Sequence, residues 1–335
     1  MRTLIIGGTR NLGPSIVSAL LEQGHQVTVF HRGLTVAELP REVQVIHGDR
    51  SDAPAFARLI GPRDFDAVID TTLYNGTDAR HAAEFFRGRT GCYIVLSTGQ
   101  VYLVREGLSR PFREQDYDGP TIPEPAPEDS FNHENWSYGM GKRAVEDSLK
   151  IAAAAGFPAI ILRLPMVNSE RDHFHRILGY LLRLWDGAPL LIPEGDGLPL
   201  RHVYGEDVIA AILACLTHTG AGGRAYNISQ DESLSLEKFL RLLAEAAGTE
   251  LQALFVPRHE LESEHLLPDC SPFSDPWMSS VSNDRSKLEL GMHYTQLCIY
   301  LPLLVEHYKR GHPAAPGYRQ RQREIAFALS RRPSQ

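Results

Sequence analysis

Short apolar runs alternate with helical segments through the first half of the chain, and this rhythm restricts the fold more than any other feature. The apolar runs are continuous, which is typical of parallel strands buried on both faces of a sheet. Strands are expected at 3–6, 26–30, 43–47, 67–70, 93–97 and 159–162, and helices at 14–23, 54–60, 79–86 and 138–154. The pattern predicts an α/β protein with a doubly wound parallel sheet of the Rossmann type.

The rhythm changes after Arg163, where Pro and Gly interrupt the chain more often. Helices are expected at 173–185 and 236–247, a strand–helix unit at 201–216, a strand at 225–229 and irregular structure at 257–280. We therefore expect a dinucleotide-binding domain at 1–170 plus about 201–230. A smaller substrate-binding lobe is expected at 171–200 and 231–325, and a tail at 326–335.

Two polar segments have alternative interpretations. The Pro-rich, acidic segment 119–135 is expected to be a surface loop, either a lid over the site or an insertion without a role. The arginines that follow Tyr318 are expected on a solvated surface helix or a frayed tail.

Composition narrows the function classes. The chain has 335 residues, 43% hydrophobic and 22% charged, with a net charge of −7, so a surface made for nucleic acid is not expected. We find no signal peptide and no apolar run long enough to span a membrane, which predicts a cytoplasmic protein. The four cysteines are scattered without metal-ligand spacing, and no metal site is predicted.

A glycine-rich turn, IGGTRNLG, joins the first expected strand to the first expected helix and contains Gly7, Gly8 and Gly13. Glycine allows positive φ and a close approach of the backbone to a ligand. The helix that follows presents N–H groups and the positive end of its dipole to a phosphate. In this context the turn predicts a dinucleotide pyrophosphate site.

The end of the second strand bears on the choice between NAD and NADP. Enzymes that use NAD usually have an acidic residue there, whereas His31 and Arg32 occupy that place here. Arg10 adds a second cation, so NADP is favoured and NAD is the alternative. Asp49, after the third strand, is expected either to accept from the adenine amine or to close a local turn.

Tyr138 and Lys142 stand four residues apart, on one face of the expected helix. An ammonium beside a phenol, helped by an oxidised nicotinamide ring, lowers the phenol pKa, so Tyr138 is expected to exchange a proton with a hydroxyl or carbonyl during hydride transfer. Ser97 and Thr98 end a central strand, where a hydroxyl can orient the substrate oxygen toward Tyr138.

These motifs resemble the extended short-chain dehydrogenase/reductase family, also called the NAD-dependent epimerase/dehydratase family. The segments that carry the resemblance are IGGTRNLG, GDRSD, VLSTGQVY, YGMGK, LRLPMVN, RHVYGEDVIAAI and NDRSKLELG. The resemblance implies that Thr98, Tyr138 and Lys142 are catalytic and that Thr98, Gln100 and Arg201 meet the substrate. The cofactor residues it implies are Gly7, Thr9, Arg10, Asn11, Leu12, Gly13, His31, Arg32, Asp49, Arg50, Thr71, Ser97, Tyr138, Lys142, Pro165 and Val167.

The chain departs from the family pattern at several positions. Arg10 replaces the middle glycine of the turn, as in an atypical subgroup that includes chloroplast stem-loop RNA-binding proteins. Gly99 and Gln100 replace the Asp-Glu pair of the dehydratases, which argues against sugar 4,6-dehydration. Arg201 matches an arginine that grips a substrate phosphate, but the second such arginine is missing near Pro272, which counts against a diphosphate-linked substrate.

We therefore expect an NAD(P)-dependent epimerase or reductase that acts on a secondary alcohol or ketone of a sugar, nucleotide-sugar or related polyol metabolite. The expected preference for NADP favours net redox, whereas the frequency of epimerases in the family favours epimerisation. A second hypothesis is a non-catalytic dinucleotide-fold protein that binds RNA or regulates a partner. By family resemblance a homodimer is expected.

Overall fold

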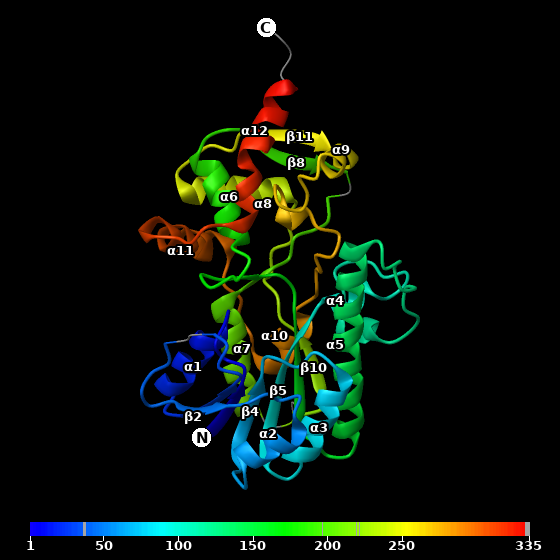
Figure 1. Ribbon diagram of the computed structural model, residues 1–335, viewed down its shortest axis with the longest axis vertical. Coiled ribbons are helices and arrows are strands. Elements are labelled where there is room, and N and C mark those ends of the chain that lie inside the picture. Colours follow the sequence, from blue (N-terminus) through cyan, green and yellow to red (C-terminus); the bar gives the residue numbers. More distant parts are fainter. Residues whose placement is uncertain (36–37, 196, 219, 221, 332–335) are drawn as a thin grey trace. The chain divides into compact units, whose positions relative to one another are not determined.

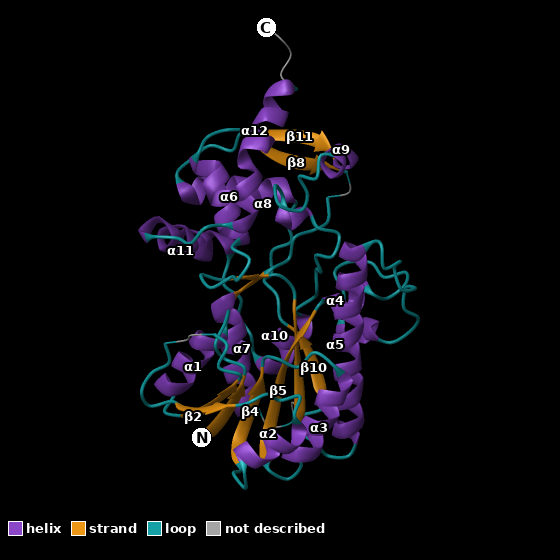
Figure 2. Ribbon diagram, in the orientation of Figure 1, coloured by secondary structure: helices purple, strands orange, loops and turns teal. Residues whose placement is uncertain are grey.

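Seven parallel strands form the central sheet of the protein, in the order β10-β6-β5-β4-β1-β2-β3 (Figures 1 and 2). The computed structural model describes residues 1–35, 38–195, 197–218, 220 and 222–331. The strands are β1 (Arg2–Ile6), β2 (Gln26–His31), β3 (Gln44–His47), β4 (Phe65–Asp70), β5 (Thr90–Thr98), β6 (Ala159–Leu164) and β10 (Arg224–Asn227). The chain builds outward from β1 in both directions, which confirms the predicted Rossmann-type sheet.

Helices cover both faces of this sheet (Figure 1). They are α1 (Gly13–Glu22), α2 (Ala53–Ile60), α3 (Gly76–Phe86), α4 (Gln100–Leu103), α5 (Ser130–Ala154), α7 (Gly205–Thr217) and α10 (Asp284–Leu290), with the 3₁₀ turn η1 (Glu114–Tyr117). Buried side chains of α2, α3 and α5 form one core with the sheet, among them Phe56, Phe86 and Leu149. Helices α1 and α7 pack together over the other face.

The contacts of the chain divide it into two compact units. The first comprises Met1–Pro165, Gly205–Ser229 and Val281–His293, and the second comprises Met166–Tyr204, Gln230–Ser280 and Tyr294–Gln335. The segment Val281–His293 therefore lies with the sheet and not with the second lobe, where we expected it. Asn283 Nδ2 donates to Ser229 O at 2.7 Å, and Ser286 Oγ donates to Asn227 O at 2.9 Å, which fixes the segment beside β10.

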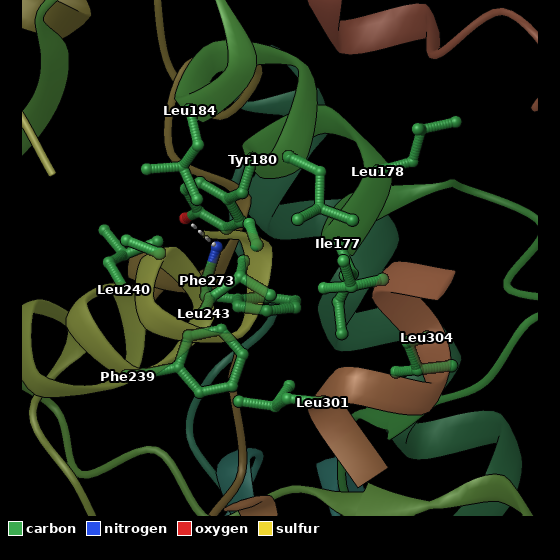
Figure 3. Packing of buried hydrophobic residues seen from close by; sticks show 14 of the residues in the cluster. Ile177, Leu178, Tyr180, Leu184, Phe239, Leu240, Leu243, Phe273, Leu301 and Leu304 are labelled. Carbon is green, nitrogen blue, oxygen red and sulfur yellow. Dashed lines mark hydrogen bonds between the residues drawn. The ribbon is translucent and has the colours of Figure 1, made fainter. Parts of the chain in front are cut away.

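The second unit is mainly helical. Its elements are β7 (Val167–Asn168), α6 (Arg176–Trp185), β8 (Leu190–Glu194), β9 (Val203–Tyr204), α8 (Leu236–Ala247), β11 (Ala253–Pro257), α9 (Arg258–Ser263), η2 (Pro272–Ser274), α11 (Leu297–Arg310), η3 (Pro316–Gln320) and α12 (Arg321–Ser330). Leucine and aromatic side chains of α6, α8 and α11 form its core, which Figure 3 shows. Tyr180 joins this core to η2 by accepting from Phe273 N at 3.0 Å.

Two helices begin elsewhere than predicted. Helix α5 begins at Ser130, inside the segment 119–135 that we expected to be entirely irregular, because the Asp129 side chain caps the helix by accepting from Asn132 N. Helix α6 begins at Arg176 and not at 173, because His175 has a φ of +51° and the Asp172 carboxylate accepts from Arg176 N at 2.9 Å.

Some of the structure in the second unit was missed. The expected irregular segment 257–280 contains α9 and η2, and β8 pairs in parallel with β11. Both strands are five residues long and interrupted or flanked by proline, so periodicity gave little signal for them.

The C-terminal helix α12 is packed into the second unit, so the prediction of a solvated helix or frayed tail was wrong. Arg321 and Glu324 are buried on it, and Glu324 pairs with Arg183 of α6 at 2.5 Å. Arg183 also donates to the carbonyl oxygens of Gly179, Asp269 and Gly317. The sequence pattern of a helix whose polar side chains pair across a buried interface is the same as that of a solvated helix.

None of the described helices combines the length and the apolar character that crossing a membrane requires.

Removal of the Glu324 carboxylate is expected to destabilise the second unit, because it leaves the fully buried Arg183 guanidinium without its counter-ion. We expect Glu324→Ala to lower the free energy of unfolding by about 3 kcal/mol, measured by urea denaturation. Arg323→Ala, which removes an exposed arginine from the same helix, is the control and should change stability by less than about 0.5 kcal/mol. Equal losses from the two variants would contradict the packed position of α12.

Candidate active site

The carboxyl ends of the parallel strands lie at one edge of the sheet, and most of the predicted site residues follow them. The glycine turn follows β1, His31 ends β2, Asp70 ends β4 and Thr98 ends β5. Register places Ile6 beside both Phe30 and Asp70, and Asp70 beside Val95. The turn and the ends of β2 and β4 are therefore brought together.

The glycine turn is held tightly against the sheet. Gly7 has a φ of +99°, and a Cβ there would lie 2.2 Å from Thr71 Oγ1; a Cβ on Gly13 would lie 2.4 Å from the Gly8 backbone. Thr71, expected to meet the cofactor, donates through Oγ1 to Ile6 O at 3.0 Å and so holds the end of β1 next to the turn. Helix α1 then begins with no acidic residue in its first turn, so the turn fits a pyrophosphate.

The cationic residues predicted to select NADP differ in their surroundings. His31 Nδ1 accepts from Gly33 N at 3.1 Å, and its ring packs edge-on against His47. Burial and then His47 lower the pKa of His31, so the ring is neutral at neutral pH. Arg10 Nε donates to Thr35 Oγ1 at 2.8 Å, and Arg32 is exposed. Of the three residues predicted to select NADP, Arg10 and Arg32 therefore supply the positive charge and His31 does not.

Asp49 and Arg50 are engaged by the protein itself. Asp49 Oδ1 accepts from Ser51 N at 2.9 Å and from Ser51 Oγ at 2.8 Å, and these bonds lower its pKa. This is the local turn that we considered as the alternative to adenine binding. Arg50 Nη1 donates to both oxygens of the buried Asp70 carboxylate, at 2.7 and 2.5 Å.

Thr98, Tyr138 and Lys142 come together as the sequence suggested. Thr98 is the last residue of β5, and its side chain hydrogen-bonds the Tyr138 hydroxyl. Lys142 is 2% exposed, and its Nζ donates to Leu73 O at 2.7 Å and to Leu96 O at 2.9 Å. One face of α5 thus carries the phenol and the ammonium to the ends of β4 and β5.

Two glycines of YGMGK let α5 approach so closely. A Cβ on Gly139 would lie 2.7 Å from Val104 Cγ1, and a Cβ on Gly141 would lie 2.7 Å from Tyr74 O. Any larger side chain at these positions would push α5, and with it Tyr138 and Lys142, away from the sheet edge.

The phenol keeps its proton at neutral pH. Loss of hydration raises the pKa of Tyr138 to about 12, although 40% of the residue is exposed. Tyr74 raises this pKa further, and the Thr98 hydrogen bond opposes the rise. Burial lowers the pKa of Lys142 to about 8, although Asp70 and Glu146 oppose this change. The expected lowering of the phenol pKa depends on the ammonium and on an oxidised nicotinamide together, and it stays a prediction. In the protein alone, the Lys142 ammonium donates to backbone carbonyls and faces a different ring.

That ring belongs to Tyr74, a residue that sequence reasoning missed. Lys142 Nζ lies 4.7 Å from the centre of the Tyr74 ring, and the rings of Tyr74 and Tyr138 are 6.4 Å apart. Tyr74 is 54% exposed, so its ring is accessible to a ligand. Its place four residues after the end of β4, at the edge where ligands bind, was the signal that could have identified it.

Ser97 and Gln100 face other parts of the first unit. Ser97 Oγ donates to Glu146 Oε1 at 2.6 Å, and Glu146 forms a fully buried ion pair with Arg163. Gln100 Nε2 donates to Asn135 Oδ1 at 2.7 Å, one helical turn before Tyr138. Ser97, expected at the cofactor, thus has a structural partner, whereas Gln100 is hydrogen-bonded to the helix that carries Tyr138.

The remaining predicted residues lie at or beyond the boundary of the first unit. Pro165 is its last residue before the chain enters the second unit, where Val167 is in β7. Arg201 is also in the second unit, and its Nε donates to Gln230 O at 2.9 Å. Within the described ranges, no group of three or more His, Cys, Asp or Glu side chains is placed to hold a metal ion.

Comparison with known proteins agrees with this geometry. A family model described as the NAD dependent epimerase/dehydratase family matches residues 3–229. The 2'-dehydrokanamycin reductase of Streptomyces kanamyceticus is 26% identical over 280 residues, which cover 81% of this chain and 75% of that protein. The chloroplast stem-loop binding protein of 41 kDa b from Arabidopsis thaliana is 25% identical over 263 residues, 74% of this chain and 63% of that protein.

Solved structures share the fold. The UDP-glucose 4-epimerase of Thermotoga maritima, determined with UDP-glucose, superposes with a TM-score of 0.72 at 18% identity, covering 92% of this chain and 99% of that one. The glycine turn, the strand-end hydroxyl and the Tyr-Lys face of α5 all fall within the matched residues 3–229. On these grounds the chain belongs to the NAD-dependent epimerase/dehydratase family.

Proposed function

We propose that the protein is an NADP-dependent reductase that converts a ketone of a sugar-like metabolite into a secondary alcohol. The observation that carries this proposal is the group formed by Thr98, Tyr138 and Lys142 at the ends of β4 and β5, in which the phenol holds its proton and the buried ammonium lies one helical turn further along α5. The likeness to 2'-dehydrokanamycin reductase also supports net redox over epimerisation.

The state of the phenol favours reduction as the direction of reaction. A bound reduced nicotinamide supplies a hydride, that is, two electrons with one hydrogen nucleus. As the carbonyl carbon is reduced, Tyr138 gives its proton to the carbonyl oxygen, and the C=O bond becomes CH–OH. An alkoxide is a stronger base than a phenolate, so a phenol with a pKa of about 12 is a competent acid here.

The neighbours of Tyr138 orient and support this step. Thr98 holds the hydroxyl by a hydrogen bond, and Gln100 lies one turn away on Asn135, where it can meet a polar substituent of the substrate. Lys142 places a positive charge near the phenolate that remains after proton transfer, which favours the product state of Tyr138. Tyr74 offers an exposed aromatic face, of the kind that packs against a sugar ring.

The cofactor is proposed to rest on the glycine turn of Gly7 and Gly13, with its 2′-phosphate near Arg10 and Arg32. An acidic side chain, which would bind the 2′-hydroxyl of NAD, is missing from the end of β2. The absence of the dehydratase Asp-Glu pair at Gly99 and Gln100 leaves hydride and proton transfer as the chemistry of the site.

Tyr138→Phe tests the assigned acid. The variant retains the ring but has no proton to give, so we expect NADPH-dependent reduction of a panel of keto-sugars to fall about 100-fold or more. NADPH binding, measured by fluorescence, should be nearly unchanged. Tyr318→Phe, which removes a phenol hydroxyl from the second unit, is the control and should retain activity. Undiminished turnover in Tyr138→Phe would exclude its role, and binding of RNA in place of NADPH would favour the non-catalytic hypothesis.

Arg32→Asp tests the choice of cofactor. Loss of a charge-assisted hydrogen bond to the 2′-phosphate should weaken NADPH binding about 10-fold or more relative to NADH, measured by calorimetry. Arg87→Asp makes the same charge change at the C-terminal end of α3 and should leave the ratio of affinities as it is. If Arg32→Asp leaves the ratio unchanged too, the 2′-phosphate is not held at this position.

The pH dependence of reduction should report Lys142. Its ammonium is present below a pKa of about 8 and is lost above it, whereas Tyr138 stays protonated to about 12. We therefore expect kcat to fall as the pH rises through about 8. In Lys142→Arg the guanidinium remains charged, so any residual activity should lack this decline. A wild-type rate that is flat to about pH 10 would show that the charge of Lys142 does not matter.

A further inference from the structure

A second buried charge, the carboxylate of Asp70, lies next to this site and has no part in the proton transfer described above. Asp70 ends β4 and is 0% exposed. Its oxygens accept from Arg50 Nη1 at 2.7 and 2.5 Å, from the Tyr93 hydroxyl at 2.6 Å and from Thr72 N at 3.1 Å. A buried charge is costly even when it is paired, which raises the question of what this one does.

The hydrogen bond from Thr72 N links Asp70 to the turn that binds Lys142. It fixes the path of the chain as it leaves β4, and the next carbonyl, that of Leu73, accepts from Lys142 Nζ at 2.7 Å. The ring that follows, Tyr74, faces the same Nζ. The Asp70 carboxylate therefore shapes the turn that holds the ammonium in place.

Charges from several elements act on Lys142. Asp70 of β4 and Glu146 of α5 favour the charged ammonium, whereas Arg50, from the segment after β3, opposes it. Asp70 has the largest of these electrostatic effects, and the phenols of Tyr74 and Tyr138 are the other titratable groups at the site. Arg50 itself is only 12% exposed, with the Asp78 carboxylate 3.9 Å from its Nε.

We propose that the buried Arg50–Asp70 pair is a positioning element for Lys142, in which Arg50 anchors the Asp70 carboxylate and Asp70 fixes the turn whose Leu73 carbonyl accepts from the ammonium. The charge of Asp70 also favours the ammonium form of Lys142, and the charge of Arg50 opposes it. Both residues act through Lys142 and neither touches the substrate. The proposal rests on the proposed function, in which Lys142 works as an ammonium. It assigns Arg50 an electrostatic role in place of the cofactor contact implied by resemblance.

The test measures the titration of Lys142 without cofactor or substrate. The chain has only five lysines, at positions 142, 150, 238, 287 and 309, so lysine labelled with ¹³C at the ε carbon gives five signals. Loss of one signal in Lys142→Met identifies the relevant resonance. Its midpoint is then compared between wild type, Asp70→Asn and Arg50→Gln.

Removing the negative charge and removing the positive charge should move the titration midpoint of Lys142 in opposite directions. Asp70→Asn removes the carboxylate and should lower it by about half a unit or more, and Arg50→Gln removes the opposing cation and should raise it. Tyr93→Phe takes one hydrogen bond from Asp70 without changing any charge and should shift it less than Asp70→Asn. Midpoints that stay fixed, or that move in the same direction, would overturn the proposal.

The double variant Arg50→Gln/Asp70→Asn guards against unfolding of the single variants, because it leaves no unpaired buried charge. Its midpoint should fall below that of wild type, since the effect of Asp70 exceeds that of Arg50; an unchanged or raised midpoint would refute the pair's role. Opposite shifts in a protein that reduces no keto-sugar with NADPH would support the pair and refute the proposed function. Where turnover is found, the decline of kcat near pH 8 should move with the midpoint.

Discussion

An ammonium group taken out of water must recover its hydrogen bonds and its counter-charges from the protein. Lys142 does so from three directions: the carbonyl oxygens of Leu73 and Leu96, the ring of Tyr74, and the carboxylates of Asp70 and Glu146. These groups lie near the carboxyl ends of β4 and β5 or on α5, so several elements meet at the Lys142 ammonium. The glycines of α5 are part of the same requirement, because they allow the helix to reach that edge.

The fold of the first unit could be predicted from sequence because its signals are local. Apolar runs of four or five residues identify most of the strands, and the glycine turn marks the connection from β1 to α1. The start of α5 at Ser130, the packing of α12 and the return of Val281–His293 to the sheet could not be predicted in this way. Each depends on a partner far along the chain, such as Arg183 for Glu324, and a polar residue does not reveal its partner.

The site shows the same division. The spacing of Tyr138 and Lys142 on one helix, and of Thr98 at a strand end, was enough to bring these three residues together. Their protonation states were not predictable, since the pKa of each group depends on packing and charges from other elements. Arg50, Asp49 and Ser97 also match a family pattern, but in this protein they are hydrogen-bonded to Asp70, Ser51 and Glu146.

The division of the chain between the two units has a consequence for how the protein is made. The chain passes from one unit to the other five times, and the first unit takes its last segment from Val281–His293. During synthesis the sheet therefore cannot be completed until β10 and α7 have been made, when most of the polypeptide has left the ribosome. A fragment ending at Pro165 would expose the edge of β6 that pairs with β10 and the face of the sheet that α7 covers, so the unit that contains the sheet cannot be excised as a simple N-terminal piece.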